Sequence, residues 1–285
     1  MRNKISPWAW VPTLYFAEGL PNVIVTIVSL VLYKQLGLSN AEITFYTSWL
    51  NLPWVVKPLW SPFVDAVKTK RWWVITMQLL IGASLGGVAF TIPTSMWLQS
   101  TLFFFWIMAF SSATHDIAAD GFYMLELNPH DQTFFVGIRS TFYRLASIFG
   151  QGVLVMIAGN IQVMLRGAIS YSWSLLFYGV AGIFIALWLW HNAKLPRPKD
   201  DTDHEQVTVT SVVSDLGKTI SSFFSKFPLK ETVFAFLFML LFRMPEGLLV
   251  KVSSLILIDS QSMSLINIRR CRRSHKCRSR WSQYH

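Results

Sequence analysis

Long apolar blocks separated by short polar stretches dominate the pattern of the chain. Each block holds roughly 20 residues or more, which is enough for a helix that crosses a bilayer core about 30 Å thick. The expected spans cover residues 8–36, 41–64, 72–92, 96–127, 134–161, 173–191 and 232–258. The first block is too long, and lacks the small-residue cleavage site, for a removed signal peptide. We therefore predict an all-α membrane protein with seven transmembrane helices.

A polar stretch follows the sixth block and contains Pro196, Pro198 and an acidic run at Asp200, Asp201 and Asp203. Such composition is typical of a linker between packed units. The predicted organisation is a six-helix transmembrane bundle over residues 1–192, a cytoplasmic linker over 193–229, a seventh transmembrane helix over 230–259 and a basic tail over 260–285.

Two of the blocks contain residues that disturb helices. Glu18 lies in the first block within the sequence EGLP, whose proline removes a backbone donor, so we expect an interruption there. The second block carries Pro53, Pro58 and Pro62 around Lys57. Glu18 and Lys57 therefore each lie beside an expected irregularity in a transmembrane helix.

Composition supports the membrane assignment, because 53% of the residues are hydrophobic and only 14% are charged, against about 25% in soluble domains. The formal net charge of +10 comes mainly from residues 268–285, which hold seven Lys and Arg, no acid and both cysteines. The remaining chain is nearly balanced, so the charge gives no basis for nucleic-acid binding. We expect the lipid bilayer and a small-molecule substrate as partners, and no nucleic acid.

Loop charges predict the orientation in the membrane. With a cytoplasmic amino terminus, the inner segments hold eleven Lys and Arg residues, against Lys34 and Arg166 on the outer side. Positively charged loops remain in the cytoplasm, so we predict a multi-pass protein of the inner (cytoplasmic) membrane with its amino terminus inside. The basic tail would then follow the seventh span on the outer side. We expect from this conflict that the tail from about Ile268 onward is read out of frame or comes from a truncated gene.

The fourth block carries the most informative charges. Asp116 and Asp120 stand four residues apart and share one face of a helix. Charged carboxylates inside a bilayer are costly, and like charges repel, so such a pair needs a wet cavity, a cation or a proton. Arg144 in the fifth block lies roughly 20 Å deep at 1.5 Å per residue and is a candidate partner for these acids. The alternative is a static ion pair that locks helices together.

Several stretches resemble the major facilitator superfamily, and within it the AmpG-type muropeptide permeases and related acetyl-CoA transporters. They are FAEGLP at 16–21, KPLWSPFVD at 57–65, SSATHDIAADGF at 111–122, YRLASIFGQG at 143–152 and FRMPEG at 242–247. The resemblance implies the amino-terminal six-helix half of that fold plus a seventh helix. It covers residues 9–264, and nearly all of the second six-helix half has no counterpart in the sequence.

The resemblance also implies a function, secondary active and proton-coupled transport, with muropeptide or another anionic solute as the substrate. Superfamily architecture places spans one, four, seven and ten around a central cavity. The expected substrate and proton pathway therefore comprises Glu18, Lys57, Asp116, Asp120, Arg144, Arg243 and Glu246, with Lys251 also in span seven. The acids would include a proton carrier and the cations would attract the substrate or hold the acids. The coupling ion is the proton, and no other cofactor is expected.

The loop between spans two and three resembles the superfamily motif Gly-x-x-x-Asp-Arg-x-Gly-Arg, with Ser61 in the glycine place and Ala66 in the first arginine place. A cytoplasmic gate is the implied role of Asp65, Lys68, Lys70 and Arg71. Positive-inside topology and a helix cap explain the three cations equally well.

Two other functions are compatible with parts of the sequence. An inactive fragment of a transporter is one alternative, and a membrane-embedded acyltransferase using His115 and Asp120 at His-x-x-x-x-Asp spacing is another. No nucleophile elbow or phosphate loop accompanies that pair, so we predict no enzyme. In the tail, Cys271, His275 and Cys277 lack the second pair that a zinc site needs, so no metal site is expected.

Overall fold

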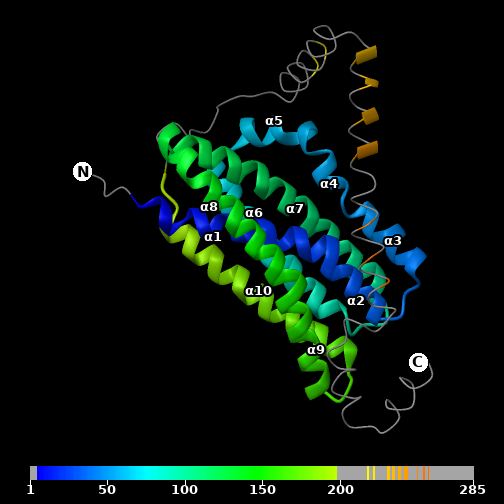
Figure 1. Ribbon diagram of the computed structural model, residues 1–285. Coiled ribbons are helices and arrows are strands. Elements are labelled where there is room, and N and C mark those ends of the chain that lie inside the picture. Colours follow the sequence, from blue (N-terminus) through cyan, green and yellow to red (C-terminus); the bar gives the residue numbers. More distant parts are fainter. Residues whose placement is uncertain are drawn as a thin grey trace, which may run out of the picture.

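The computed structural model describes residues 5–197 and scattered residues between 217 and 256. Residues 5–197 are helical and without strands (Figure 1). The helices are α1 (Val11–Val23), α2 (Ser29–Gln35), α3 (Asn40–Trp49), α4 (Leu52–Val55), α5 (Lys57–Val67), α6 (Lys70–Thr91), α7 (Trp97–Glu126), α8 (Pro129–Ile148), α9 (Val155–Met164) and α10 (Ile169–Lys194). A 3₁₀ turn, η1 (Pro7–Ala9), precedes them, and two π-helical segments, η2 (Ile24–Val28) and η3 (Phe149–Leu154), join α1 to α2 and α8 to α9. The all-α membrane fold predicted from the sequence is confirmed.

Five helical stretches in the described part of the chain are long and apolar enough to cross a membrane. They are Pro7–Gln35, Lys70–Thr91, Trp97–Glu126, Pro129–Met164 and Ile169–Lys194. These correspond to the expected spans one, three, four, five and six, with boundaries that differ by a few residues. Apolar block length therefore identifies these spans well.

The second expected span differs from the prediction, because the structure divides it into α3, α4 and α5. Proline lacks a backbone N–H and its ring clashes with the preceding turn, so it starts helices more readily than it continues them. Pro53 lies in the first turn of α4 and Pro58 in the first turn of α5. The break between these helices makes Lys57 the first residue of α5.

The first span was expected to break at Glu18, and this detail was wrong. Helix α1 continues through Glu18 and contains Pro21. The irregularity follows three residues later as the π-helical segment η2, where the turn widens to accommodate the disturbed hydrogen bonding. A second π-helical segment, η3, lies against it on the fifth span. The two spans therefore deviate from α-helical geometry at the same place.

Helix α7 lies at the centre of the arrangement, in contact with both α1 and α6. Helix α6 packs between α7 and α10, while α1 packs against both α7 and α8 (Figure 1). The beginnings of α1, α6 and α8 lie at the same end of the bundle as the ends of α7 and α10. Contacts across that end include the Nε1–H of Trp190, which donates to the carbonyl oxygen of Ala9 at 2.9 Å.

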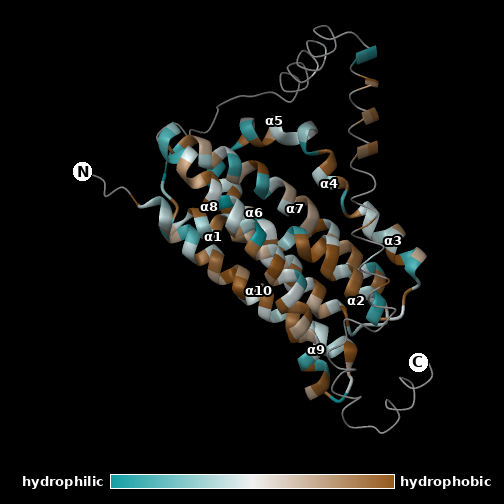
Figure 2. Ribbon diagram, viewed as in Figure 1, coloured by the Kyte–Doolittle hydropathy of each residue, from teal (hydrophilic) through white to brown (hydrophobic). Residues whose placement is uncertain are grey.

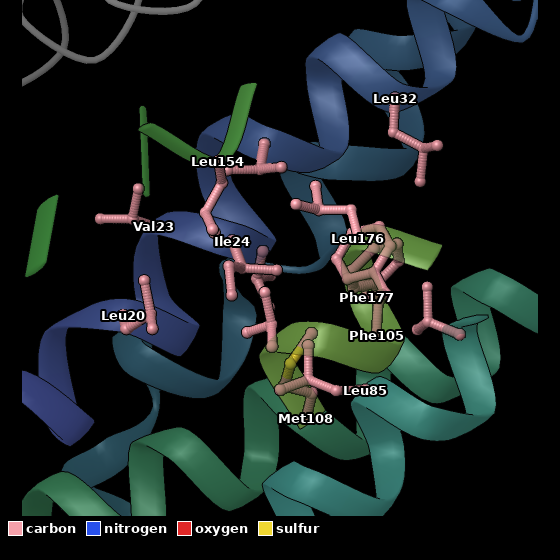
Figure 3. Packing of buried hydrophobic residues seen from close by; sticks show 14 of the residues in the cluster. Leu20, Val23, Ile24, Leu32, Leu85, Phe105, Met108, Leu154, Leu176 and Phe177 are labelled. Atoms are coloured by element: carbon pink, nitrogen blue, oxygen red, sulfur yellow. The ribbon is translucent and has the colours of Figure 1, made fainter. Parts of the chain in front are cut away.

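Apolar packing holds the other half of the bundle together. Hydrophobic residues dominate α2 and α10 (Figure 2). A cluster of fully buried side chains there joins α1, η2, α6, α7 and α10, and it includes Leu20, Ile24, Leu85, Phe105 and Phe177 (Figure 3). Interhelical packing of this kind stabilises helices in lipid, where no hydrophobic effect drives their association. A second, smaller apolar cluster that includes Trp10, Leu14 and Phe122 lies where α1 begins and α7 ends, so apolar packing extends through both halves of the bundle.

Parts of the predicted organisation lie outside the described residues. They are most of the linker over 193–229, the basic tail over 260–285, and Arg243, Glu246 and Lys251 of the expected seventh span. The scattered described residues between 230 and 256 are helical.

Candidate functional site

A polar cavity of about 340 Å³ lies between α1, α7 and α8. The residues that line it are Tyr15, Glu18, Asp116, Asp120, Arg139, Ser140, Tyr143 and Arg144. Ionisable groups within membrane spans concentrate where water or a counter-charge reaches them. The cavity brings together four residues of the predicted pathway, namely Glu18, Asp116, Asp120 and Arg144.

Asp116 is paired with a cation from a different helix. Its carboxylate forms an ion pair with the ammonium group of Lys57, the first residue of α5, and the side chains are 18% and 26% exposed. The position of Lys57 follows from the break between α4 and α5, which directs the start of α5 toward α7. Lys57, a fifth residue of the predicted pathway, is therefore joined to the cavity through its ion pair with Asp116.

Two neighbours, one charged and one aromatic, hold Asp120. Its Oδ1 lies 3.1 Å from Nη1 of Arg139 and accepts a hydrogen bond from the hydroxyl of Tyr15 at 3.0 Å. The guanidinium of Arg139 also lies over the rings of Tyr15 and Tyr123, at 4.9 and 5.4 Å from their centroids. Cation–π contacts and the charge-assisted hydrogen bonds act together to fix Arg139. Asp120 is consequently anchored to both α1 and α8.

The sequence suggested Arg144 as the partner of the acids on α7, but the structure gives that place to Arg139. Five residues on a helix correspond to about 500°, so the two arginines point in directions roughly 140° apart. Arg144 still lines the cavity, yet within the described residues it makes no ion pair. It is a cation on the cavity wall that has no ion-pair partner in that part of the chain.

Glu18 is the third acid of the cavity and the most buried, at 7% exposure. Its Oε2 makes no hydrogen bond in the described part of the protein, although a buried carboxylate oxygen normally has a donor. Neither Arg139 nor Lys57, which pair with the acids of α7, forms an ion pair with it. Within the described part of the chain, Glu18 therefore differs from Asp116 and Asp120 in having no cation at ion-pair distance.

Gly19 positions Glu18 beside α8. A Cβ atom at Gly19 would lie 2.9 Å from the carbonyl oxygen of Tyr143 and 3.1 Å from Cβ of Ala146. The absence of a side chain thus allows α1 to approach α8 closely. This approach brings Glu18 to the wall formed by Tyr143 and Arg144.

The predicted gate residues lie at the same end of the bundle as the beginning of α1. Asp65 forms an ion pair with Lys70 across the turn between α5 and α6. Arg71 donates to the carbonyl oxygens of Asn192 and Leu195 at 2.8 and 3.3 Å, so it caps the end of α10. Lys68 is the residue after the last turn of α5. The cluster links three helices, which is compatible with either the gate or the purely structural interpretation.

His115 does not pair with Asp120 as the acyltransferase alternative requires. Its Nε2 lies 3.0 Å from Nε2 of Gln78 on α6, whereas Asp120 contacts α1 and α8. The two side chains therefore project toward different neighbours of α7.

Several residues of the site were not singled out from the sequence. Arg139 and Gln78 are polar residues within apolar spans, and that position alone was a signal for both. Tyr15, Ser140 and Tyr143 gave no signal, because such residues are common in membrane helices.

Comparison with known proteins identifies the family to which the chain belongs. The sequence model of the BT1 family matches residues 17–256. AmpG 4 of Rickettsia felis, which is named as a candidate transporter, is 26% identical over 249 residues, covering 85% of this chain and 57% of the relative. An uncharacterized protein of Schizosaccharomyces pombe is 25% identical over 231 residues, covering 73% of this chain and 41% of the relative. The chain thus spans about half the length of these relatives. It belongs to the BT1 family, which consists of major-facilitator-type transporters.

Proposed function

We propose that the chain carries the proton-binding and substrate-binding half of a secondary transporter, with Glu18 as the proton carrier. The observation that carries this proposal is the unequal pairing of the three cavity acids. Asp116 and Asp120 each have a cation within ion-pair distance, and Glu18 has none among the described residues. A carrier must gain and lose its proton in each cycle, which a carboxylate locked in an ion pair does poorly.

Arg144 has the complementary role in this proposal. It lines the same cavity as Glu18 and lacks an ion-pair partner in the described part of the chain. A guanidinium binds carboxylate or phosphate oxygens in bidentate fashion, so it suits an anionic solute. A muropeptide carries such carboxylates, and the resemblance of the sequence motifs to AmpG-type muropeptide permeases favours that substrate class.

The environment of the transporter is also part of the proposal. We infer that the protein lies in the inner membrane with its amino terminus in the cytoplasm. The support is the position of Lys70, Arg71 and Lys194 at the end of the bundle where α1 begins, because basic residues favour the cytoplasmic side. Asp65 and its cations would then face the cytoplasm and act on the opening of the cavity.

The test is uptake by the full chain in proteoliposomes, with a labelled muropeptide and an imposed proton gradient. Replacement of Glu18 by Gln should abolish gradient-driven accumulation, while exchange of labelled for unlabelled solute continues, because only the proton step is lost. Glu42→Gln is the matched control, since Glu42 is an exposed carboxyl on α3 and Gln preserves the capping box with Ser39.

Two results would contradict the proposal in different ways. Accumulation by the Glu18→Gln protein at the normal level would exclude Glu18 as the carrier. No movement of solute by the unaltered chain, with the protein correctly folded, would favour the alternative of an inactive fragment.

A further inference from the structure

A second group of polar side chains is buried on the other side of α7 from the cavity. The Oγ1 of Thr13 lies 2.9 Å from Nε2 of His191, and Nδ1 of His191 lies 2.9 Å from Oε1 of Gln78. The Nε2 of Gln78 in turn lies 3.0 Å from Nε2 of His115. We call these four residues the imidazole chain. It joins α1, α10, α6 and α7, and its two histidines and Gln78 are fully buried.

The hydrogens of the imidazole chain can be arranged in two directions. In the first, each group donates toward Thr13, and the hydroxyl of Thr13 donates to the carbonyl oxygen of Trp10, 3.2 Å away. Both imidazoles then carry their proton on Nε2, and the amide of Gln78 is turned so that its oxygen faces His115. In the second direction both imidazoles carry their proton on Nδ1, because Gln78 donates to His115 and accepts from His191.

The two directions differ in what they leave unsatisfied. Nδ1 of His115 is buried and has no hydrogen-bond partner in the described part of the protein. The second direction places an N–H at that atom and also withdraws the hydroxyl of Thr13 from the carbonyl of Trp10. The first direction leaves a lone pair of His115 without a donor, gives each contact between neighbouring members one donor, and treats the second amide N–H of Gln78 no differently from the second direction. A buried donor without an acceptor costs more than an imidazole lone pair without a donor, so the first direction is favoured.

We propose that Gln78 is a positioning residue for the cavity. It holds both imidazoles neutral with their protons on Nε2, and through His115 it fixes the rotation of α7 about its axis. His115 immediately precedes Asp116, so the same rotation directs Asp116 into the cavity toward Lys57. The orientation of Asp116 does not depend on transport, whereas any consequence for transport rests on the proposed function above.

The first experiment measures the protonated nitrogen of each imidazole. The full chain, labelled with ¹⁵N-histidine and placed in lipid nanodiscs, is examined by NMR, and His115 and His191 are assigned by single replacement. We expect both to be neutral with the proton on Nε2. Protons on Nδ1 at both residues, or a charged imidazole at either, would overturn the direction proposed for the chain.

The second experiment measures the direction of Asp116. In a background with Ser at Cys271 and Cys277, Asp116→Cys reports how fast a water-soluble thiol reagent reaches the cavity wall. Adding Gln78→Met, which keeps the length of the side chain but removes its hydrogen bonds, should slow the reaction about fivefold, equivalent to about 1 kcal/mol. An unchanged rate in a folded protein would exclude the positioning role.

Ser84→Ala is the matched control for the second experiment. Ser84 is a buried polar residue on the same helix, but its hydroxyl donates to the carbonyl of Leu80 within α6 and reaches no other helix. The reaction rate should not change in this variant. Should the Gln78→Met protein fail to fold, the NMR measurement on the unaltered side chains still tests whether Gln78 holds both imidazoles neutral with their protons on Nε2.

Discussion

The two sides of α7 accommodate polar groups within the membrane-spanning bundle in different ways. Toward α1 and α8 the helix presents Asp116 and Asp120, which are charged, half-buried and paired with Lys57 and Arg139. Toward α6 and α10 it presents His115, which is fully buried and takes part in a chain of neutral groups. Residues 115 and 116 are neighbours in sequence and about 100° apart on the helix.

The difference shows where a membrane protein tolerates charge. Charges remain on the side that a cavity opens to water, because desolvation of an ion is expensive in a bilayer. On the closed side the groups are neutral and satisfy one another by hydrogen bonds across four helices. We interpret the first side as the part that binds and releases, and the second as the part that keeps the helices in register.

Removal of Arg139 tests the charged side, and its effect on stability should be at least as large as that of each variant described below. Arg139→Met leaves Asp120 without its cation and deprives Tyr15 and Tyr123 of their cation–π partner. Because both charged side chains are about one third exposed, we expect a loss of about 1–3 kcal/mol, below the cost for a fully buried pair. Thermal unfolding in detergent micelles measures it, and the loss should shrink at high salt.

A double variant separates the charge from the packing. Arg139→Met combined with Asp120→Asn should recover most of the lost stability, since no unpaired carboxylate remains. Arg139→Lys should be intermediate, because an ammonium keeps the charge but lacks the planar group that stacks on two rings. Equal losses in the single and double variants would show that the ion pair does not hold α8 to α7.

Removal of His191 tests the neutral side. His191→Leu leaves Gln78 and Thr13 without their shared partner, and a buried polar group left unsatisfied costs about 1–3 kcal/mol. Because no formal charge is involved, the loss should be independent of salt, in contrast to that of Arg139→Met. A salt-dependent loss would indicate that His191 carries a charge in the folded protein and would remove the distinction between the two sides.

The hydroxyl of Tyr15 offers a smaller test of the charged side. Tyr15→Phe removes the 3.0 Å hydrogen bond to Asp120 but keeps the ring beneath Arg139. We expect a loss of about 1 kcal/mol in the same unfolding measurement. A loss as large as that of Arg139→Met would mean that Tyr15, and not the arginine, anchors Asp120.

Sequence reasoning located the spans better than it located the contacts. Block length and hydropathy identified five spans, because a bilayer imposes those quantities directly on each helix. The second expected span is helical over the predicted range but is divided into α3, α4 and α5, since its prolines start new helices and hydropathy does not register them. The gathering of Glu18, Asp116 and Asp120 in one cavity could be anticipated, because charges inside spans seek each other or water.

Partners could not be read from the sequence for a geometric reason. Arg139 and Arg144 are equally compatible with a contact to α7 until the rotation of α8 is known. Similarly, Gln78 meets two histidines that lie 37 and 113 residues away in the chain. Such meetings depend on the relative rotation of helices, which small differences in packing determine.

The smallest effect on stability is expected at the ion pair of Asp65 and Lys70, which lies at the turn between α5 and α6. The Asp65 side chain is 57% exposed and that of Lys70 is 11% exposed, so the pair is unequal. Asp65→Asn should cost less than about 1 kcal/mol, as solvent screens the lost attraction. Lys70→Ala should cost more, because a Cβ at Gly121 of α7 would lie 3.0 Å from Cε of Lys70, so the lysine stem packs on that helix. Thermal unfolding of both variants measures the two losses of stability, and equal losses would contradict the prediction that Lys70→Ala costs more than Asp65→Asn. A larger loss of stability for Lys70→Ala would show that the main contribution of Lys70 is the packing of its stem on α7. The Asp65–Lys70 pair would then serve mainly to hold helices together and would contribute little as a charge pair.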